Sequence, residues 1–236
     1  MLSRTAFLLL IALACVSTNS AHADSPHVLV FGNTVKPAHR EIIPIAGRAF
    51  SRFLGENHVQ ADFSQDTSLF QSSLLKKYSA LVFLDTSEKI LNPEQQKVVE
   101  LYFKKGGGIL AIHSSIAMGN DWPWFKSLIG NSFKSHPPIH SEKVNLAPCL
   151  QASASGADDL SWSQEDEWYE FSSSLSPEFQ IIATVNSQPV SWYRETNGTG
   201  RFWYTAMGHS PNLYNGSSPS FMSHLLAGTK WVLKGR

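Results

Sequence analysis

The stretch "GGGILAIHSS", residues 106–115, decides the fold, because three glycines precede an apolar run and His113 follows it. Glycine loops that bind phosphate lie after a strand and before a helix, so that amides at the helix N-terminus face the anion. Here a helical pattern that begins at Asn92-Pro93-Glu94 precedes the glycines, and a strand-like run follows them. The glycines are therefore predicted to be a helix C-cap and turn rather than a nucleotide cradle, with His113 at the end of a buried strand.

Strand-like and helix-like segments alternate along the chain. The predicted strands are 27–31, 59–63, 80–84, 109–112, 180–185, 190–194 and 202–207, and the predicted helices are 42–54, 68–78, 92–103 and 220–233. Residues 135–138 and 153–163 are predicted to be loops or surface excursions. Continuous apolar strands are typical of a sheet covered on both faces. This order predicts a three-layer α/β domain with a mostly parallel central sheet.

The N-terminus has the pattern of a secretory signal. Arg4 precedes a short apolar run, and a small-x-small cleavage site ends at Ala23. We expect a signal peptide at residues 1–23, a single domain at 24–236 and a periplasmic or secreted protein without a membrane span. A lipoprotein anchor at Cys15 is the alternative, although Ala12 stands where leucine is usual. Because 19 basic and 19 acidic residues balance, the charge does not favour nucleic acid.

Three histidines and one aspartate follow predicted strands. His39 lies after the first strand, Asp85 after the third, His113 after the fourth and His209 after the last. Because ligands of such sheets bind beyond the carboxyl ends of the strands, we expect these side chains to meet at one edge. A single histidine at a strand end is more often a structural, hydrogen-bonded residue than a catalyst. Together they predict proton transfer, or a divalent metal such as zinc on His39, His113 and His209.

A second unusual stretch, "QEDEWYEF" at residues 164–171, sets acids beside large aromatic residues. Aromatic rings stack on sugars and carboxylates accept hydroxyl protons, so we expect Trp168 and Tyr169 to bind a sugar ring and Asp166 or Glu167 to position or activate it. A solvated acidic turn is the alternative. The further candidates for substrate binding are His136, Arg194, Asp85 and Ser114.

A nucleophile for covalent acyl chemistry is missing from the sequence patterns. Ser114 and Ser115 follow His113, but there is no G-x-S-x-G elbow. Cys149 would be the one cysteine left after signal cleavage. There is also no H-E-x-x-H pair, so any metal site must use ligands that are distant in the sequence.

Five segments of the chain resemble the ThuA-like family, named for trehalose utilisation. They are "FLDTSEKILNPEQQKVVELYFKKGGGILAIHSS", "DWPWFKSLIGNSFKSHPPI", "DEWYEF", "PVSWYRETNGTGRFWYTAMGHSPNLY" and "HLLAGTKW". The resemblance implies a flavodoxin-like fold of the class I glutamine amidotransferase type. It also implies that glutaminase activity is absent, because His113 stands where the amidotransferases have their cysteine. The first loop departs from the family at Ala38 and Glu41, where arginine and serine are usual.

These patterns give three functional hypotheses. The first is an exported enzyme, a hydrolase or a lyase or isomerase, that acts on a glycoside or keto-sugar through His113, His209 and the acidic stretch. The second is a carbohydrate-binding module that uses the same cleft without catalysis. The third is a structural or partner-binding protein, for which sugars and metals would give no stabilisation.

Overall fold

The computed structural model describes residues 26–147, 161–196 and 198–234. The predicted signal peptide, its cleavage site near Ala23, Cys149 and most of the segment 153–163 lie outside the described residues. Among the residues that are described, no helix is both long and apolar enough to cross a membrane.

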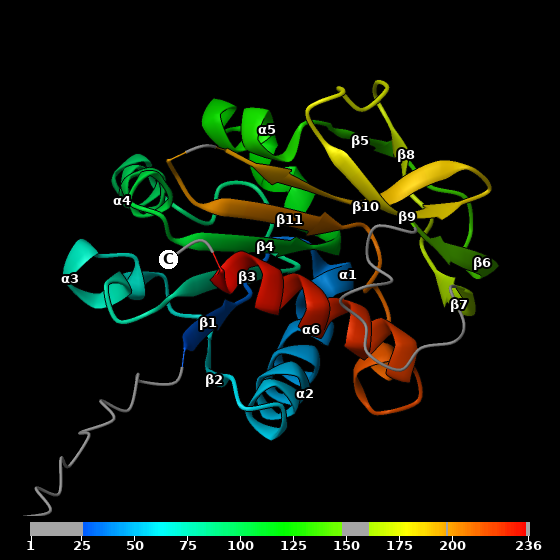
Figure 1. Ribbon diagram of the computed structural model, residues 1–236, viewed down its shortest axis with the longest axis horizontal. Helices are drawn as coiled ribbons and strands as arrows, with labels where there is room; N and C mark the ends of the chain where they lie inside the picture. Colours follow the sequence, from blue (N-terminus) through cyan, green and yellow to red (C-terminus); the bar gives the residue numbers. More distant parts are fainter. Residues whose placement is uncertain (1–25, 148–160, 197, 235–236) are drawn as a thin grey trace, which may run out of the picture.

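A nine-stranded sheet runs through the domain in the order β2-β1-β3-β4-β11-β10-β9-β6-β7 (Figure 1). Its strands are β1 His27–Phe31, β2 Gln60–Ser64, β3 Ala80–Leu84, β4 Gly108–Ile112, β6 His140–Leu146, β7 Ser161–Asp166, β9 Gln180–Val185, β10 Gln188–Glu195 and β11 Arg201–Thr205. The strands from β2 to β11 pair in parallel, and those from β11 to β7 pair antiparallel. The predicted α/β fold with a sheet that is parallel at its centre is therefore confirmed.

Helices cover both faces of the parallel strands. They are α1 Pro37–Arg40, α2 Ile42–Glu56, α3 Ser72–Leu75, α4 Pro93–Lys104, α5 Pro123–Ile129 and α6 Pro219–Leu233, with 3-10 turns at Thr67–Leu69, His113–Asn120 and Pro211–Tyr214. In β3, Val82 packs with α2 and α6, whereas Phe83 packs with α4 and α5 on the other face. This two-sided burial explains why the strand sequences are continuously apolar.

Several segments differ from the sequence prediction. The strands β6 and β7 were not predicted, because "HSEKVNL" buries only Val144 and "SWSQED" buries two polar residues, Gln164 and Asp166. Residues 161–163, predicted to be part of a surface excursion, begin β7. The predicted helix 68–78 is a 3-10 turn followed by the single turn α3. A short ribbon of β5 Phe133–Ser135 and β8 Glu170–Phe171 stands apart from the main sheet, so Ser135 lies in a strand and not in the predicted loop.

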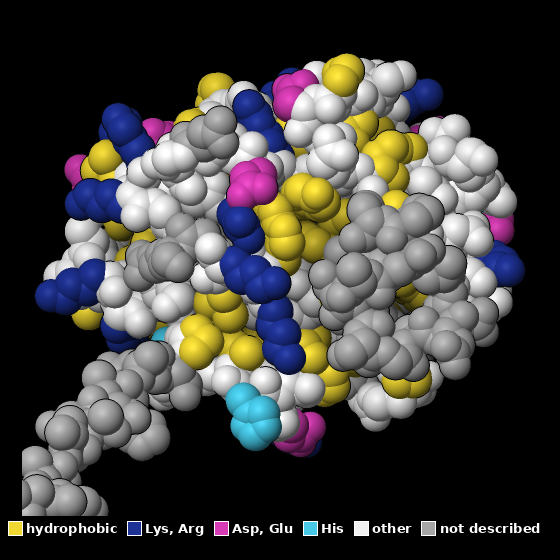
Figure 2. Space-filling model, viewed as in Figure 1, with side chains coloured by type: hydrophobic (Ala, Val, Ile, Leu, Met, Phe, Trp, Pro, Cys, Tyr) yellow, Lys and Arg dark blue, Asp and Glu magenta, His cyan; other side chains and the backbone are white. Residues whose placement is uncertain are grey.

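Charged groups of both signs are spread over the surface. On the face shown in Figure 2, lysine and arginine side chains run in a column among apolar and uncharged groups. A cavity of about 420 Å³ is lined by Lys105, Arg201, Lys234 and the acidic Glu195. The Arg201 guanidinium is 2.7 Å from Glu195, so the basic lining of this cavity is partly neutralised by an acidic neighbour.

Two of the glycines in the run 106–108, between α4 and β4, have clear structural reasons. Gly106 ends α4 with a φ of +94°, which is the left-handed conformation that glycine adopts at helix ends. Gly108 begins β4 where the backbone of α6 approaches: a Cβ atom there would lie 2.5 Å from the carbonyl oxygen of Val232. The glycines therefore serve helix capping and close packing.

Replacement of Gly108 by alanine should destabilise the domain, because the new Cβ clashes with a backbone atom that cannot rotate away. We expect Gly108→Ala to lower the free energy of unfolding by about 1–3 kcal/mol in urea denaturation. Gly55→Ala is the matched control, since nothing lies within 4 Å of its Cβ position and alanine favours the helix. Equal stability of the two variants would contradict this packing.

Candidate active site and metal centre

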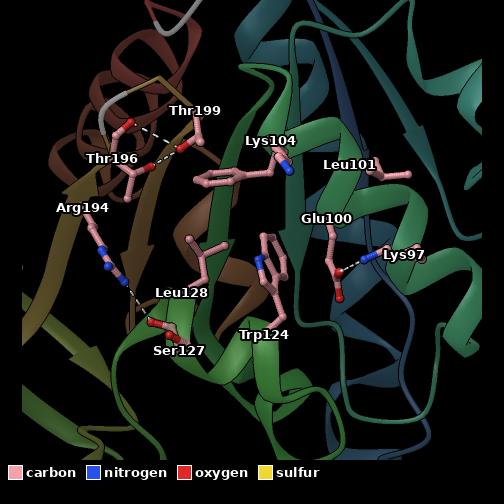
Figure 3. A pocket seen from close by; sticks show the side chains of 11 residues that line it. Lys97, Glu100, Leu101, Lys104, Trp124, Ser127, Leu128, Arg194, Thr196 and Thr199 are labelled. Carbon is pink, nitrogen blue, oxygen red and sulfur yellow. Dashed lines mark hydrogen bonds and ion pairs between the residues drawn. The ribbon is translucent and has the colours of Figure 1, made fainter.

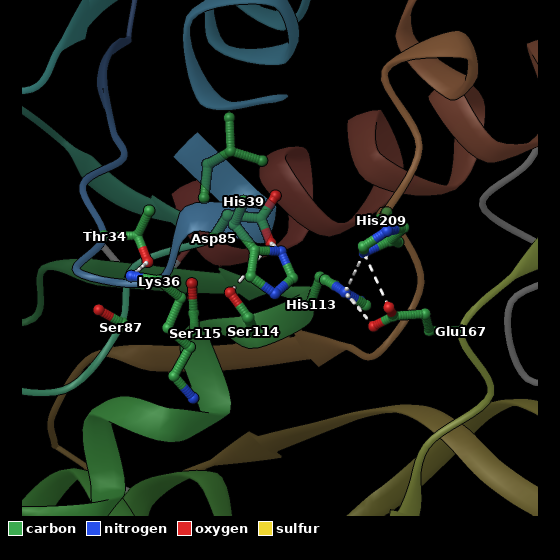
Figure 4. Close-up of polar contacts among 12 residues, drawn as sticks. Thr34, Lys36, His39, Asp85, Ser87, His113, Ser114, Ser115, Glu167 and His209 are labelled. Carbon is green, nitrogen blue, oxygen red and sulfur yellow. Dashed lines mark hydrogen bonds and ion pairs between the residues drawn. The ribbon is translucent and has the colours of Figure 1, made fainter. Parts of the chain in front are cut away.

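The candidate site lies at the carboxyl ends of the parallel strands (Figure 4). His39 comes from α1 after β1, Asp85 directly follows β3, His113 directly follows β4, and His209 lies in the loop after β11. Glu167 joins them from the end of β7, on the antiparallel part of the sheet. The structure thus places His39, Asp85, His113 and His209 at one edge of the sheet. Of the two acids proposed from the sequence, Asp166 and Glu167, it is Glu167 that joins them.

His39, His113, His209 and Glu167 each offer one ligand atom to a common point. These four atoms all lie within 4.8 Å of one another. Nε2 of His113 is 3.2 Å from Nδ1 of His209 and 3.3 Å from Oε2 of Glu167. Nδ1 of His209 is 3.4 Å from Oε1 of Glu167. Three ring nitrogens and one carboxylate in this geometry are a donor set that suits a divalent metal.

His113 is held in the left-handed backbone region, with a φ of +51°. Its ring is fully buried, and its Nδ1–H donates to the carbonyl oxygen of Ala206 at 2.6 Å. The Tyr204 hydroxyl donates to the carbonyl of His113 at 3.2 Å. Because a carbonyl only accepts, Nδ1 carries the proton, and Nε2 faces the cluster. Asp85 has a φ of +48°; two non-glycine residues in this region at one sheet edge indicate a functional site.

A buried carboxylate lies behind His39. Oδ1 of Asp85 accepts a hydrogen bond from the Ser114 hydroxyl at 3.0 Å and lies 3.4 Å from Nδ1 of His39. Oδ2 of Asp85 has no hydrogen-bond partner among the described residues. Nδ1 of His39 also makes no hydrogen bond among the described residues, so the carboxylate lies close to the ring as an ion-pair partner rather than as a hydrogen-bond acceptor.

Asp166 fixes the loop that carries His209. Its side chain accepts hydrogen bonds from the backbone N–H groups of Gly208 at 2.8 Å and of His209 at 3.1 Å. It also accepts from Gln164 at 2.7 Å, and its exposed fraction is 1%. Asp166, which the sequence suggested as a catalytic acid or base, therefore positions the site, while Glu167 reaches into it.

The electrostatics of the cluster are strongly coupled. Burial by itself lowers the pKa of His113, but the hydrogen bond to Glu167 and the charges of Asp85 and Asp166 raise it to about 9. Burial raises the pKa of Glu167, but His113 and the nearby His209 lower it to about 2. Burial and the charge of His113 lower the pKa of His209. The protein without metal thus holds an ion pair between His113 and Glu167, and a divalent cation can replace the proton in it.

The two aromatic rings predicted to stack on a sugar are not presented to solvent. Trp168 is 7% and Tyr169 is 8% exposed, and the two pack in opposite layers of the core. Trp168 donates its indole N–H to the carbonyl of His140 at 2.8 Å. The Tyr169 hydroxyl, in contrast, lies 2.9 Å from Nε2 of His113, and the two rings are also in contact, with centroids 4.6 Å apart.

Two other residues predicted to bind substrate lie away from the centre of the cluster: His136 at the mouth of the site, and Arg194 at the opposite edge of the sheet. Nε2 of His136 is 3.6 Å from Oε1 of Glu167, and its side chain is 34% exposed, so His136 lies at the mouth of the site. Arg194 lies at the opposite edge, because it pairs with Phe202 at the start of β11. There it donates to the carbonyl of Ser127 and lines a separate cavity of about 430 Å³ (Figure 3). Its predicted place in the site is wrong, since β10 runs antiparallel to its neighbour.

Sequence reasoning missed the groups that hold the cluster in place. They are the Ala206 carbonyl, the Tyr204 hydroxyl and Gln164. None has a local sequence signal, since a carbonyl is common to every residue and Tyr204 lies inside an apolar strand. The alternation of side chains along an extended chain could have shown only that Glu167 and Tyr169, two residues apart, point to the same side.

Comparison with known proteins identifies the family. The family model ThuA, described as trehalose utilisation, matches residues 27–232. The chain belongs to the ThuA family. The family description gives this ThuA-family protein a carbohydrate-related role. A comparison with curated proteins finds no match.

Solved structures agree with this assignment at the level of the fold. A putative ThuA-like protein from Bacteroides uniformis ATCC 8492 is 20% identical, with a TM-score of 0.74 over 92% of this chain and 94% of that chain. A second, from Parabacteroides merdae ATCC 43184, is 17% identical, with a TM-score of 0.69 over 89% and 90%. The glutaminase domain of Trypanosoma brucei CTPS with bound acivicin is 7% identical, with a TM-score of 0.53 over 87% and 94%. The class I glutamine amidotransferase-like fold is therefore confirmed.

Loss of the Asp166 carboxylate should release the loop that carries His209. In Asp166→Asn, an NH₂ group replaces one of the two carboxylate oxygens. One of the backbone N–H groups of Gly208 and His209 then faces a donor in place of its acceptor. We expect the free energy of unfolding to fall by about 1–3 kcal/mol, measured by urea denaturation. Glu165→Gln is the control, because the neighbouring Glu165 is exposed. An Asp166→Asn protein as stable as Glu165→Gln would show that these hydrogen bonds do not hold the loop.

Proposed function

We propose that this protein is a metal-dependent enzyme that acts on a glycoside or keto-sugar, as a hydrolase or as a lyase or isomerase. The proposal rests on one observation, the convergence of His39, His113, His209 and Glu167 to within 4.8 Å. The family description, trehalose utilisation, supports a sugar as the substrate class. The N-terminal pattern supports export to the periplasm or the medium.

The distances within the cluster fit a zinc-like ion. A tetrahedral ion with bonds of about 2.0–2.1 Å has ligand atoms about 3.3 Å apart. Nε2 of His113 and Nδ1 of His209 are 3.2 Å apart, and each lies 3.3–3.4 Å from one oxygen of Glu167, His113 from Oε2 and His209 from Oε1. The backbone carbonyl of Ala206 supplies His113 with the outer hydrogen bond that such ligands usually have, and the Asp85 carboxylate lies 3.4 Å from Nδ1 of His39.

The chemistry divides between the ion and the residues around it. His39, His113, His209 and Glu167 would hold the divalent ion, which would supply Lewis-acid polarisation of a substrate carbonyl or hydroxyl oxygen if that oxygen took a further coordination position. In the metal-free protein, the protonated Nε2 of His113 lies 2.9 Å from the Tyr169 hydroxyl, and this contact would be released if that nitrogen bound the ion. Burial raises the pKa of Tyr169, so this hydroxyl stays protonated and can donate a hydrogen bond to a substrate oxygen.

His136 is placed to contact a substrate at the mouth of the site. Its ring lies 3.6 Å from Glu167 and is more exposed than the rings of His39, His113 and His209. Tyr169 and His136 thus offer two hydrogen-bonding groups to a substrate beside the cluster.

Metal content tests the proposed centre directly. Protein purified without chelator or metal-affinity resin should contain close to one equivalent of zinc, manganese or iron by elemental analysis. His113→Ala and His209→Ala should each lose most of it, since removing one ligand of four weakens binding strongly. His140→Ala is the control, because His140 pairs with Glu142 outside the cluster. A metal content below about a tenth of an equivalent, which does not rise on reconstitution, would contradict the metal centre. Proton transfer by the histidines without a metal would then be the remaining mechanism.

Turnover of sugars tests the enzymatic half of the proposal. Trehalose, sucrose and lactose and their 3-keto forms would be incubated with the native protein and the products followed by mass. We expect at least one substrate to be converted, and His113→Ala to lower kcat/KM by about a hundredfold or more. Saturable binding without conversion would instead support the carbohydrate-binding module. Absence of both binding and conversion would contradict a sugar as the ligand.

A further inference from the structure

One large aromatic ring near the candidate site remains exposed. Phe133 in β5 is 41% exposed, although phenylalanine is usually buried in folded proteins. The two rings that the sequence suggested for sugar stacking, Trp168 and Tyr169, are buried instead. The site therefore does present an aromatic surface, but from a different element.

Phe133 lies next to the metal-binding cluster through two ring contacts. Its ring packs edge-on against Tyr169, with centroids 4.6 Å apart. The Tyr169 ring lies another 4.6 Å from the ring of His113, so Phe133 and His113 are separated by no more than two ring contacts. The ring of Phe133 is also 5.9 Å from that of His136, which lies 3.6 Å from Glu167.

The short ribbon of β5 and β8 holds Phe133 in place. Phe133 pairs with Phe171 across the ribbon, and the backbone N–H of Ser172 donates to the carbonyl of Ser132 at 2.9 Å. Just before the ribbon, the Asn131 amide donates to the carbonyl of Ser173, also at 2.9 Å. An exposed ring on a backbone fixed in this way loses little conformational freedom when a ligand binds, which favours affinity.

We infer that Phe133 is the platform on which the apolar face of the substrate's sugar ring stacks, and that it determines specificity for the substrate. The C–H groups of a pyranose face carry partial positive charge and meet the negative face of an aromatic ring. A sugar placed on Phe133 would have its hydroxyl groups within reach of His136 and of the cluster. This inference rests on the proposed function and adds a residue that binds substrate without binding metal.

Substitution at Phe133 separates ring stacking from the chemistry. For whichever sugar of the panel the native protein converts or binds, Phe133→Ala should raise KM or Kd about tenfold. Phe133→Trp should keep or improve affinity for the sugar, because tryptophan offers a larger aromatic ring for stacking. Zinc content and thermal midpoint should stay at the native values in both variants, because Phe133 contributes no ligand atom and its ring is largely exposed. Leu101→Ala is the matched control, since Leu101 on α4 is also 41% exposed.

The outcomes distinguish this inference from the proposed function. If the native protein handles a sugar and Phe133→Ala has a KM or Kd within twofold of Leu101→Ala, the stacking platform is wrong and the proposed function stands. If Phe133→Ala loses zinc or stability together with affinity, the residue is structural and the inference is likewise overturned. If the native protein binds and converts no sugar of the panel, both are contradicted.

Discussion

The hydrogen bond between Nδ1 of His113 and the carbonyl of Ala206, 2.6 Å long, is the interaction on which the site depends. It joins the ends of β4 and β11, which pair in parallel, and it fixes a histidine whose backbone has a φ of +51°. Such a conformation costs about 1–3 kcal/mol for a non-glycine residue and persists only where the surroundings impose it. The bond fixes a proton on Nδ1 and directs Nε2 toward His209 and Glu167, so the cluster follows from this one constraint.

The buried charges around His113 explain why the cluster is suited to a cation. Asp85 and Asp166 are buried at 0% and 1% exposure, and Glu167 lies within 3.3 Å of the ring. Burying unpaired carboxylates is costly, and the protein offsets this cost by holding a proton on His113, whose pKa is raised to about 9. A divalent ion supplies the same compensation with more charge. The carboxylates therefore serve the metal-free and metal-bound states alike.

The sequence was sufficient for the parallel half of the sheet and for the residues that end its strands. Asp85 and His113 could be placed because each follows a fully apolar run, whose end is unambiguous. The orientation of the acidic stretch 164–171 was harder to predict. It depends on the pairing of β7 with β6, and β6 has no apolar pattern because its one buried apolar residue is Val144. Without that register, nothing in the sequence decides whether Asp166 or Glu167 faces the cluster, or that Trp168 is buried. Arg194 was misplaced because the direction of β10 depends on the antiparallel pairing with β11, which a strand pattern alone does not give.

X-ray anomalous scattering from crystals of the native protein, grown with zinc and measured on both sides of the zinc absorption edge, tests the central claim most directly. The account predicts one strong anomalous peak about 2.0–2.1 Å from a ring nitrogen of each of His39, His113 and His209 and from a carboxylate oxygen of Glu167. It also predicts that the Tyr169 hydroxyl has moved away from Nε2 of His113. A cluster that stays free of zinc at saturating concentration, with the Tyr169 bond intact, would contradict it.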